Sequence, residues 1–523
     1  MIKSVRIKNL RSLADTGWLR IRPITLLLGA NSSGKSTFLR SFPLFTQSVN
    51  KALRGPISWF DDSLVDFGDY ETAKNRYAHE GDKIQFYYDL EAPFIPGYLH
   101  SGRDDLSRLL GNVRDLFVSF SLSNDSKGTY ISSVSYKVKD VELSLSITDR
   151  SSKVNFAVNG KKVNVGDADV RWNATSYDNI LPNFEYSVKI GPQMRPSART
   201  PRLFYGDIVG FVKERSDRRL QNTDKVHVMI EKWGLDKAEY LSWLQKSSPI
   251  ISFRNYIQDW TADDQEFTNF YNLIALFRLL PAWDLIDMEI TRFYMFCSYI
   301  APTRAEANRY YRTQGLQVND IDPYGKNLQE FISSLSTQNL ASYNAYMENT
   351  LGIRARTKTE TGHQSIMVKN DRGEFNITDV GFGYSQILPI VTKLWYTANR
   401  RKVRSRRIYY YDEGFHSVIL MEQPELHLHP AYQAKIADAF VNAVTIEIKE
   451  EDTLSLIIET HSDTILNRIG RRVREGKISP DDVNIILFEK KMGEPITQAR
   501  QTTFNTNGQV EEWPYGFFDP NDD

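Results

Sequence analysis

The sequence predicts an α/β protein whose main sheet is parallel and buried on both faces. Three apolar runs indicate this sheet: PITLLLG at 23–29, SVILM at 417–421 and LSLII at 454–458, each followed by polar residues. Such continuous apolar strands are typical of parallel sheets, because helices cover both faces. The length of 523 residues exceeds one ordinary compact domain, so further structural units are expected.

A second kind of strand follows the first buried run. KIQFYYDL at 83–90 and VSYKVKDVELSLSIT at 134–148 alternate apolar and polar residues, with Gly and Asp turns between them. Alternation of this kind is typical of antiparallel strands with one exposed face. Residues 1–202 are therefore predicted to join the first buried strand to an antiparallel β-subdomain.

A helical pattern rich in tryptophan follows, from about residue 203 to residue 287. Four tryptophans are spread through charged surroundings there, which predicts a helical insertion with its own small core. Residues 288–523 carry the other two buried runs and are predicted to complete the main sheet.

Composition excludes several classes of protein. Lys+Arg and Asp+Glu both total 65, so bulk charge does not hold a nucleic acid. The single cysteine excludes an intramolecular disulfide and a cysteine-based zinc site, and fits a reducing compartment. The N-terminus lacks the pattern of a signal peptide, and no run approaches the roughly 20 apolar residues that span a bilayer. We expect a cytoplasmic protein without a membrane partner.

The strongest motif is GANSSGKST at 29–37, which fits the P-loop pattern and lies between an apolar strand and a helical pattern. Glycines let the backbone curl so that its N–H groups point at phosphate oxygens, and the following helix N-terminus favours negative charge. Lys35 would reach the β- and γ-phosphates of ATP, and the Ser36 hydroxyl would ligate Mg²⁺. A chance glycine turn is the alternative, and it leaves the strand and helix on either side unexplained. The predicted nucleotide-binding residues of this loop are Gly29, Asn31, Ser32, Ser33, Gly34, Lys35, Ser36 and Thr37.

A second motif, EQPELHLHP at 422–430, directly follows a buried strand. In P-loop proteins such a strand delivers carboxylates to the Mg²⁺ and to the attacking water. Glu422 is predicted on the metal side, with Gln423 beside the γ-phosphate. Glutamine orients water but accepts no proton, which predicts slow hydrolysis unless Glu425 or another group helps. The alternative for Glu422 is a strand-end carboxylate that faces solvent.

Two further motifs are candidates for contact with the γ-phosphate. ETHSD at 459–463 places His461 just past a buried strand, where a neutral imidazole would hydrogen-bond a phosphate oxygen; a purely structural histidine is the alternative. TDVGFGYSQILPIV at 378–391 is a glycine-rich turn that opens a helical pattern and suits an anion, and its alternative is an ordinary capped turn.

The order of these motifs resembles the ABC-type ATPase heads of the structural-maintenance and overcoming-lysogenization-defect lineage. PELHLHP and ETHSD make the resemblance specific, and it covers roughly residues 1–95 and 290–523. A bacterial subgroup with E-Q-P-E-L-H-L-H-P, V-G-F-G-x-S-Q and a C-terminal W-P-x-G-F-F-D is similar, and here the last motif is Trp513 to Asp519. The resemblance implies an ABC-type P-loop ATPase head with an antiparallel N-terminal β-subdomain and a helical insertion, using ATP and Mg²⁺.

The same resemblance implies a nucleotide site shared between two chains. Gly383 corresponds to the signature glycine that closes on the γ-phosphate held by another subunit, so the expected assembly is a homodimer around an ATP sandwich. Gly381 stands where many such signatures have serine, and Ser385 follows in the same turn. Members of the lineage include ATPases of antiphage systems such as Septu and some retrons. A separate HNH-type nuclease, or a retron reverse transcriptase with its non-coding RNA, is therefore the expected partner.

Two other functions stay open at this point. A DNA-repair or chromosome-maintenance clamp should have a long coiled-coil arm, and the chain shows no heptad pattern. A scaffold that binds ATP with negligible turnover is consistent with Gln423.

Nucleic-acid contact through local basic clusters is a further expectation, since Lys and Arg attract any phosphate backbone. The alternative for each cluster is a solvated face, and Arg304 is weighed in the same way, as a contact to phosphate or a partner head against an ordinary solvated arginine. The clusters are Arg195 with Arg199 and Arg202, Arg400 to Arg407, and Arg468 to Arg474.

Overall fold

The parallel sheet predicted from the apolar runs is present in a computed structural model of the chain, together with an antiparallel sheet. By its internal contacts the chain forms two compact units, residues 1–9, 48–58 and 78–292 in the first and residues 10–47, 59–77 and 293–523 in the second. The structure describes residues 2–49, 51, 53–91, 115–164, 169–173, 179–190, 193–196, 204–216, 223–312, 318, 320–360, 362–399, 416–445, 453–490 and 496–512.

The first unit is built on an antiparallel sheet in the order β10-β9-β8-β7-β6-β5-β1. Buried apolar and less buried polar residues alternate along these strands, which confirms the prediction for 83–90 and 134–148. The second of these segments is two strands joined by a turn. The strands are β1 (Ile2–Leu10), β5 (Ile84–Leu90), β6 (Leu116–Asp125), β7 (Gly128–Val138), β8 (Val141–Ser146), β9 (Asn155–Val158) and β10 (Lys161–Val163). A separate small sheet contains β11 (Asp169–Asn173), β12 (Asn183–Ile190) and β13 (Gln193–Pro196).

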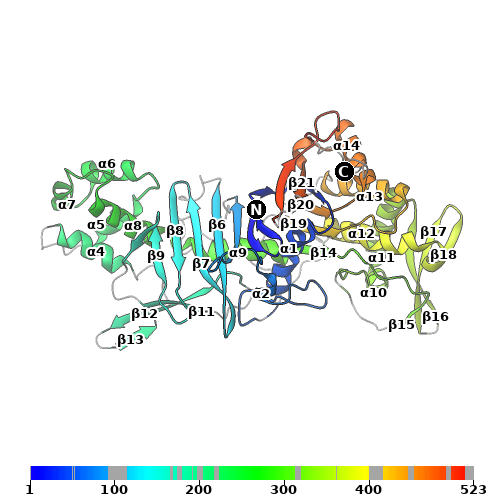
Figure 1. Cartoon of the computed structure of the whole chain (residues 1–523), viewed down its shortest axis with the longest axis horizontal. Helices are drawn as coiled ribbons and strands as arrows, with labels where there is room; N and C mark the ends of the chain where they lie inside the picture. The colour runs from blue at the N-terminus through cyan, green and yellow to red at the C-terminus, as the bar shows by residue number, and fades with distance from the viewer. Residues whose placement is uncertain are drawn as a thin grey trace. The chain divides into compact units, whose positions relative to one another are not determined.

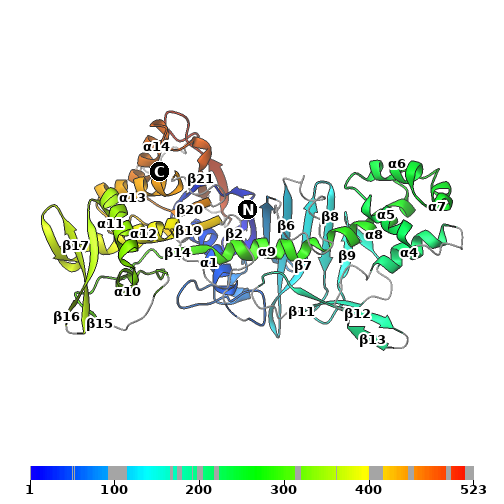
Figure 2. The same cartoon turned by 180° about the vertical axis from the view of Figure 1, so that it is seen from behind.

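Helices of the first unit follow the sheet in sequence, as the helical pattern predicted. α8 (Gln265–Leu279) and α9 (Ala282–Met295) run across one face of the antiparallel sheet, whereas the other face carries no helix in the described part of the chain (Figures 1 and 2). The Tyr136 hydroxyl on β7 donates to the Leu279 carbonyl oxygen at 2.6 Å, which fixes the end of α8 against the sheet. The division into residues 1–202, 203–287 and 288–523 stays a prediction.

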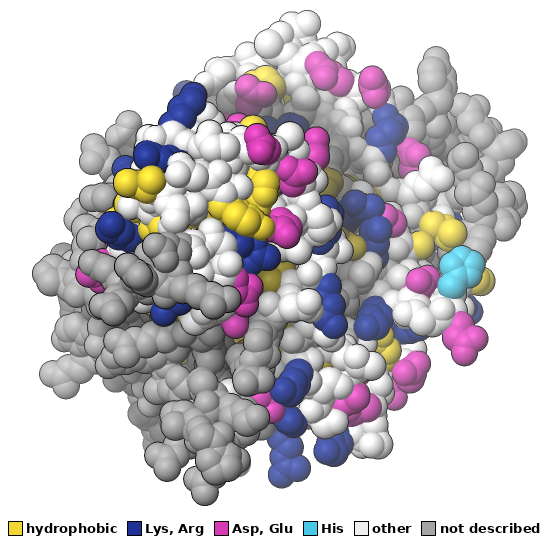
Figure 3. All heavy atoms as spheres, turned by 90° about the vertical axis from the view of Figure 1, so that its left-hand side faces the viewer, with side chains coloured by type: hydrophobic (Ala, Val, Ile, Leu, Met, Phe, Trp, Pro, Cys, Tyr) yellow, Lys and Arg dark blue, Asp and Glu magenta, His cyan; other side chains and the backbone are white. Residues whose placement is uncertain are grey.

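The predicted small core of the helical segment is aromatic. The Phe211 ring stacks on Phe270 with centroids 4.9 Å apart, and Trp233 packs on Tyr271 at 5.4 Å. The outer surface of these helices mixes hydrophobic, cationic and anionic side chains (Figure 3). The remaining helices are α4 (Tyr205–Glu214), α5 (Asp224–Glu231), α6 (Lys237–Ser247) and α7 (Ile251–Tyr256).

The second unit contains the sheet that the three apolar runs predict. Its order is β14-β19-β20-β4-β21-β22, and every neighbouring pair is parallel except β21 with β22. All three runs lie in central strands, so the predicted parallel sheet is confirmed. The strands are β14 (Cys297–Ile300), β19 (His416–Glu422), β20 (Thr453–Glu459), β4 (Ile24–Gly29), β21 (Val483–Glu489) and β22 (Gln498–Thr502).

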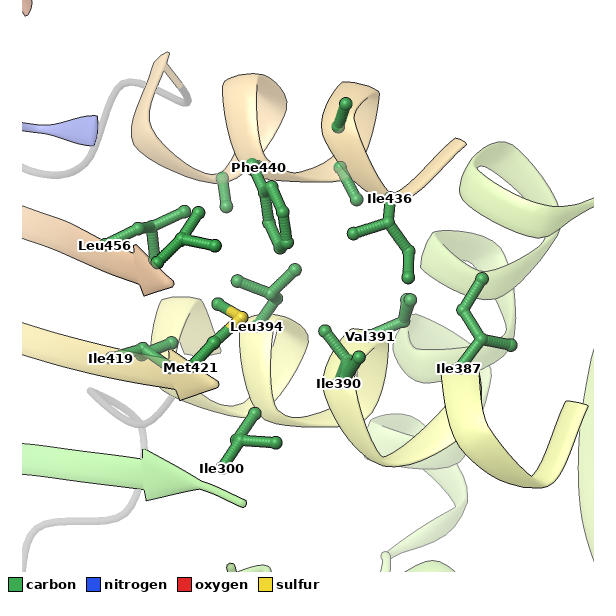
Figure 4. Close-up of a cluster of buried hydrophobic side chains, with 14 of the residues drawn as sticks. Ile300, Ile387, Ile390, Val391, Leu394, Ile419, Met421, Ile436, Phe440 and Leu456 are labelled. Atoms are coloured by element: carbon green, nitrogen blue, oxygen red, sulfur yellow. The ribbon is translucent and has the colours of Figure 1, made fainter. Parts of the chain in front are cut away.

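Helices bury the apolar side chains of this sheet. Figure 4 shows one such layer, in which Met421 and Leu456 from the strands meet Leu394 of α12 and Phe440 of α13. These side chains are almost fully buried, which fits the continuous apolar character of the strands. The helices of this unit are α1 (Lys35–Val49), α2 (Tyr70–Ala73), α10 (Leu328–Ser334), α11 (Thr337–Leu351), α12 (Phe382–Asn399), α13 (Pro430–Thr445) and α14 (Asp463–Arg474). Short strands complete it: β2 (Leu13–Asp15), β3 (Leu19–Arg20), β15 (Tyr311–Arg312), β16 (Arg354–Glu360), β17 (His363–Asn370) and β18 (Gly373–Asn376).

Among the described residues, no helix combines the length and the apolar character needed to cross a membrane. The predicted α/β class, with a parallel main sheet and an antiparallel N-terminal sheet, is confirmed.

Candidate nucleotide site

Three of the sequence motifs meet at one edge of the parallel sheet. β4 ends at Gly29, where the P-loop begins, and the neighbouring β20 ends at Glu459. β19 lies on the far side of β20, and its last residue, Glu422, is directly opposite Glu459. The carboxyl ends of parallel strands are where α/β proteins place their ligands. The strand order therefore brings together motifs that are hundreds of residues apart in the chain.

The P-loop has the backbone that its glycines predict. Gly29 has φ +151° and Gly34 has φ +99°, conformations that other residues rarely adopt. A Cβ on Gly29 would also lie 2.3 Å from the Phe488 carbonyl oxygen, so neighbouring β21 leaves room for glycine alone. Asn31 and Ser32 are exposed at the tip of the loop, and Thr37 is half-buried in the first turn of α1.

Lys35 is the first residue of α1 and lies folded back over the loop. Its Nζ donates to the carbonyl oxygens of Gly29 at 2.9 Å and Ala30 at 2.7 Å, and the residue is 3% exposed. Burial lowers the pKa of this lysine, while Glu459 acts in the opposite direction. An ammonium held on two backbone carbonyls lies beside the loop backbone, where it can exchange these contacts for phosphate oxygens.

Glu459 is a functional candidate that the sequence reasoning missed. The Ser36 hydroxyl donates to Glu459 Oε1 at 2.9 Å, whereas the prediction named Glu422 as the carboxylate on the metal side with Ser36. The other oxygen, Oε2, is buried and has no hydrogen-bond partner within the described ranges. Burial, followed by the nearby charge of Glu422, raises the pKa of Glu459 to about 7. The available signal was a carboxylate at the end of a buried strand, the same signal that identified Glu422.

Glu422 is 3% exposed, so the alternative of a solvent-facing carboxylate is wrong. Arg40, on α1, donates from Nε and Nη2 to its two oxygens, both at 2.7 Å, and the Tyr299 hydroxyl donates to Oε1 at 2.7 Å. The hydrogen bond from Arg40 to Glu422 is the main cause that raises the pKa of this guanidinium. Both oxygens of Glu422 are thus held by its own chain, and its metal-side role stays a prediction.

Gln423, Glu425 and His461 surround the ends of β19 and β20. Gln423 adopts φ +42°, and its backbone N–H donates to the Glu459 carbonyl oxygen at 2.8 Å. Glu425 Oε1 accepts from the His461 backbone N–H at 2.7 Å, and Oε2 is buried without a partner in the described part of the chain. Burial is the main cause that raises the pKa of Glu425 and also lowers that of His461. Glu425 contacts the backbone N–H of His461, which leaves the ring nitrogens out of this contact.

Arg304 is 2% exposed, so the alternative of an ordinary solvated arginine is wrong. Its Nη2 donates to the Pro424 carbonyl oxygen and its Nη1 to that of Ala301, both at 3.3 Å. The Gln386 amide on α12 donates to the Arg304 carbonyl oxygen at 3.4 Å. Burial lowers the pKa of Arg304 to about 10. Arg304 therefore joins the loop after β19 to the helix that follows the glycine-rich turn.

The glycine-rich turn is presented outward. Gly381 has φ +99°, is exposed, and a Cβ on it would meet no atom within 4 Å. Phe382 begins α12 at 45% exposure and packs edge-on against the His427 ring at 5.3 Å. The Ser385 hydroxyl is buried and donates to the Phe382 carbonyl oxygen at 2.6 Å, so it serves its own helix. Gly383, between them, is half-buried.

The basic clusters differ in what the structure shows of them. Arg468 and Arg472 both donate to the carboxylate of Asp438, and Arg471 pairs with Glu475 at 2.8 Å. These arginines are neutralised within the chain, which favours the interpretation of a solvated face. Arg195 lies in β13. The other members, Arg199, Arg202 and Arg400 to Arg407, and also Trp513 to Asp519, lie outside the described residues.

The residues at the P-loop edge fit a magnesium nucleotide. Besides Glu459 Oε2, the Ser33 hydroxyl is buried without a hydrogen-bond partner in the described part of the chain. Unpaired buried polar groups are costly, so one in the P-loop and one on the carboxylate that contacts Ser36 together indicate a ligand. The described ranges hold no group of three or more His, Cys, Asp or Glu able to bind a metal alone, and Mg²⁺ commonly combines one or two carboxylates with substrate phosphates and water. Ser33 and Lys35 would hold phosphates, and Ser36 with Glu459 would hold the metal.

Comparison with known proteins gives matches at the level of families and structures. A family model described as "AAA domain, putative AbiEii toxin, Type IV TA system" matches residues 24–467, and one described as "Protein of unknown function (DUF3696)" matches residues 478–523. A comparison with curated proteins gives no match.

Two structures of SMC heads align over nearly the whole chain. One, of the SmcHead bound to the C-winged helix domain of ScpA, has 10% identity and a TM-score of 0.32 and covers 96% of this chain and 98% of its own. The SMC head domain from Thermotoga maritima has 8% identity and a TM-score of 0.31, with 95% and 98% covered. Similarity this low carries no argument about the fold.

Proposed function

The chain belongs to the AAA-type ATPase family described as putative AbiEii toxins of type IV toxin–antitoxin systems, and from this premise we propose that it binds Mg²⁺-ATP at the P-loop edge and hydrolyses it slowly. The observation that supports this most directly is the convergence of Lys35, Ser36 and Glu459 on one loop. A protein catalyses phosphoryl transfer mainly by positioning the reacting groups and by compensating the negative charge of the phosphates. A lysine, a hydroxyl and a carboxylate in this arrangement provide both.

Slow turnover is proposed from the environment of the predicted catalytic groups. Gln423 has an amide, which orients water but accepts no proton at neutral pH. Glu425 Oε1 accepts a hydrogen bond from the His461 backbone N–H. We assign it to positioning the His461 loop, with Gln423 orienting the water. An ATPase without a general base holds its nucleotide for long periods.

Assembly into a dimer around ATP is proposed from the exposed turn. Gly381 and Phe382 face solvent, and the Ser385 hydroxyl serves its own helix. A glycine with open space around it allows a phosphate of another subunit to approach the backbone closely. The exposed turn would therefore meet the nucleotide held by a second copy.

A regulatory role in antiphage defence is the biological part of the proposal. The family description refers to a toxin–antitoxin system, and the motifs at 422–430 and 380–386 resemble those of antiphage ATPases. In this role the closed dimer would restrain or release a separate HNH-type nuclease, or a retron reverse transcriptase with its RNA. Long nucleotide-bound lifetimes suit such a holding function.

Single-turnover hydrolysis tests the catalytic part of the proposal. We expect slow hydrolysis by the wild type and an acceleration in Gln423→Glu, because general-base assistance is worth roughly 10²–10⁴ in rate. Glu425→Gln is the matched variant and should change the rate less. Brisk wild-type hydrolysis that Glu425→Gln abolishes would make Glu425 the base. Absence of turnover in both wild type and Gln423→Glu would favour an ATP-bound scaffold.

A further inference from the structure

The sheet places a C-terminal segment beside the P-loop. β21 is parallel to β4, and its Phe488 is opposite Gly29, the first residue of the loop. β22 is antiparallel to β21 and starts at Gln498, which is opposite Glu489. Thr497, the residue before β22, therefore lies at the edge of the sheet where the P-loop begins. This segment belongs to the region matched by the model of unknown function, outside the matched AAA domain.

The Thr497 hydroxyl is buried and unpaired among the described residues. The residue is 2% exposed, and its Oγ1 has no hydrogen-bond partner within the described ranges. Burying a hydroxyl without a partner costs about 1–3 kcal/mol, so such a group normally finds a partner in the protein, in ordered water or in a ligand. A valine of the same shape would avoid this cost.

The Thr497 side chain lies against the P-loop. An ideal Cβ on Gly34 would lie 3.5 Å from Thr497 Oγ1, and 2.9 Å from both the Ser12 hydroxyl and Leu13 Cδ2. Gly34 is directly followed by Lys35, and Ser33, the preceding residue, has a buried hydroxyl that is also unpaired among the described residues. Two buried hydroxyls, both unpaired within the part of the chain that the structure describes, thus lie on or against the same three-residue stretch of the P-loop.

We infer that the Thr497 hydroxyl is a further nucleotide ligand, donating a hydrogen bond to an oxygen of the phosphate chain bound by the P-loop. This inference rests on the proposed binding of ATP and extends it, because it makes β22 and its preceding residue part of the nucleotide site. A hydroxyl donates readily to a charged phosphate oxygen, and such bonds are stronger than those between neutral groups. Binding of the nucleotide then holds the start of β22 against the loop.

Substitution by valine and by serine tests the inference with and without the hydroxyl. Calorimetry in Mg²⁺ should show ATP binding weakened roughly tenfold or more in Thr497→Val, the effect expected for one hydrogen bond to a charged group, and little changed in Thr497→Ser. Without nucleotide, Thr497→Val should melt at or above the wild-type temperature, because it removes an unsatisfied buried hydroxyl. Inorganic tripolyphosphate should lose affinity for Thr497→Val by the same factor as ATP.

Three results would contradict the inference, and each points to a different reason. Equal ATP binding by wild type and Thr497→Val removes Thr497 from the site. A lower melting temperature of nucleotide-free Thr497→Val means that the hydroxyl supports the fold. A loss confined to ATP, with tripolyphosphate unaffected, excludes the phosphate contact. Failure of the wild type itself to bind ATP would instead refute the proposed function.

Discussion

The P-loop edge and the glycine-rich turn at Gly381–Gly383 lie in the same unit but differ in exposure: the lysine and the strand-end carboxylates of the first are buried, and the start of the second faces solvent. At the P-loop edge, Lys35 and Glu422 are each 3% exposed and are held by groups of their own chain. At the turn, Gly381 and Phe382 are exposed, and a Cβ on Gly381 would meet none of the described atoms within 4 Å.

The difference concerns what each region can do alone. At the P-loop edge, Lys35, Ser36 and Glu459 all come from a single chain, so we expect one chain to suffice for holding a nucleotide. An exposed glycine turn presents backbone to solvent and acts only when another surface meets it. We therefore expect nucleotide binding and nucleotide-dependent association to be separable by mutation.

The largest expected effect is that of Lys35→Ala on ATP binding. Loss of the P-loop ammonium removes charge-assisted bonds to the phosphates worth about 3 kcal/mol, or roughly 10² in Kd. Lys435→Ala is the control, because Lys435 also donates to a backbone carbonyl oxygen, that of Leu351, at 3.0 Å. Calorimetry that shows equal ATP affinity for Lys35→Ala and the wild type would contradict the P-loop assignment.

Gly383→Glu should abolish ATP-dependent association while leaving ATP affinity nearly intact. A Cβ at Gly383 would lie 3.7 Å from Leu428, an ordinary contact, so the unit should fold. A carboxylate facing a γ-phosphate across the dimer adds both bulk and like charge. Light scattering with a slowly hydrolysed ATP analogue measures association, with Gly210→Glu as the control in an open helical position of α4. If both variants associate like the wild type, the cross-subunit site is wrong.

Glu459→Gln should lose most of the ATP affinity that Mg²⁺ adds, by roughly tenfold, since groups around a bound metal typically contribute 10–100-fold. ATP affinity without Mg²⁺ should be unchanged, because Lys35 and the loop backbone still hold the phosphates. Titrating Mg²⁺ at fixed ATP measures the effect, and Glu475→Gln, whose carboxylate pairs with arginines of α14, is the control. An unchanged Mg²⁺ dependence would return the metal-side role to Glu422 alone.

Phe382→Ala should give the smallest effect, a weakening of ATP-dependent association by a few-fold with no change in ATP affinity. Exposed aromatic side chains at the centre of an interface contribute more than most residues when a partner buries them. Phe375→Ala removes another exposed phenylalanine, at 38% exposure on β18, and is the matched control. Equal losses in the two variants would mean that Phe382 has no special place in the interface.

Much of the fold could be predicted because its signals are local. The three buried runs at 23–29, 417–421 and 454–458 became β4, β19 and β20, since continuous apolar strands need helices on both faces. The P-loop is a contiguous motif, and its glycines at 29 and 34 have the backbone that the motif requires. Hydrophobic periodicity and contiguous motifs predict the local structure of the residues that form them.

Pairings across the chain could not be predicted in the same way. Ser36 reaches Glu459, which is 423 residues away, and Arg40 reaches Glu422, which is 382 residues away. Glu425 looked like a free candidate base, yet one of its oxygens accepts from the His461 backbone N–H.

The sequence by itself determined the strands, the phosphate-binding loop and the types of residue at the strand ends. Only the tertiary structure decided which carboxylate faces Ser36, that Arg304 is buried, and that Thr497 lies beside Gly34. Sequence patterns record which face of each element is apolar, but the order of strands β19-β20-β4-β21-β22 sets the neighbours of every strand end. That order depends on how all strands and helices of the unit pack together, and this packing involves residues that are far apart in the chain.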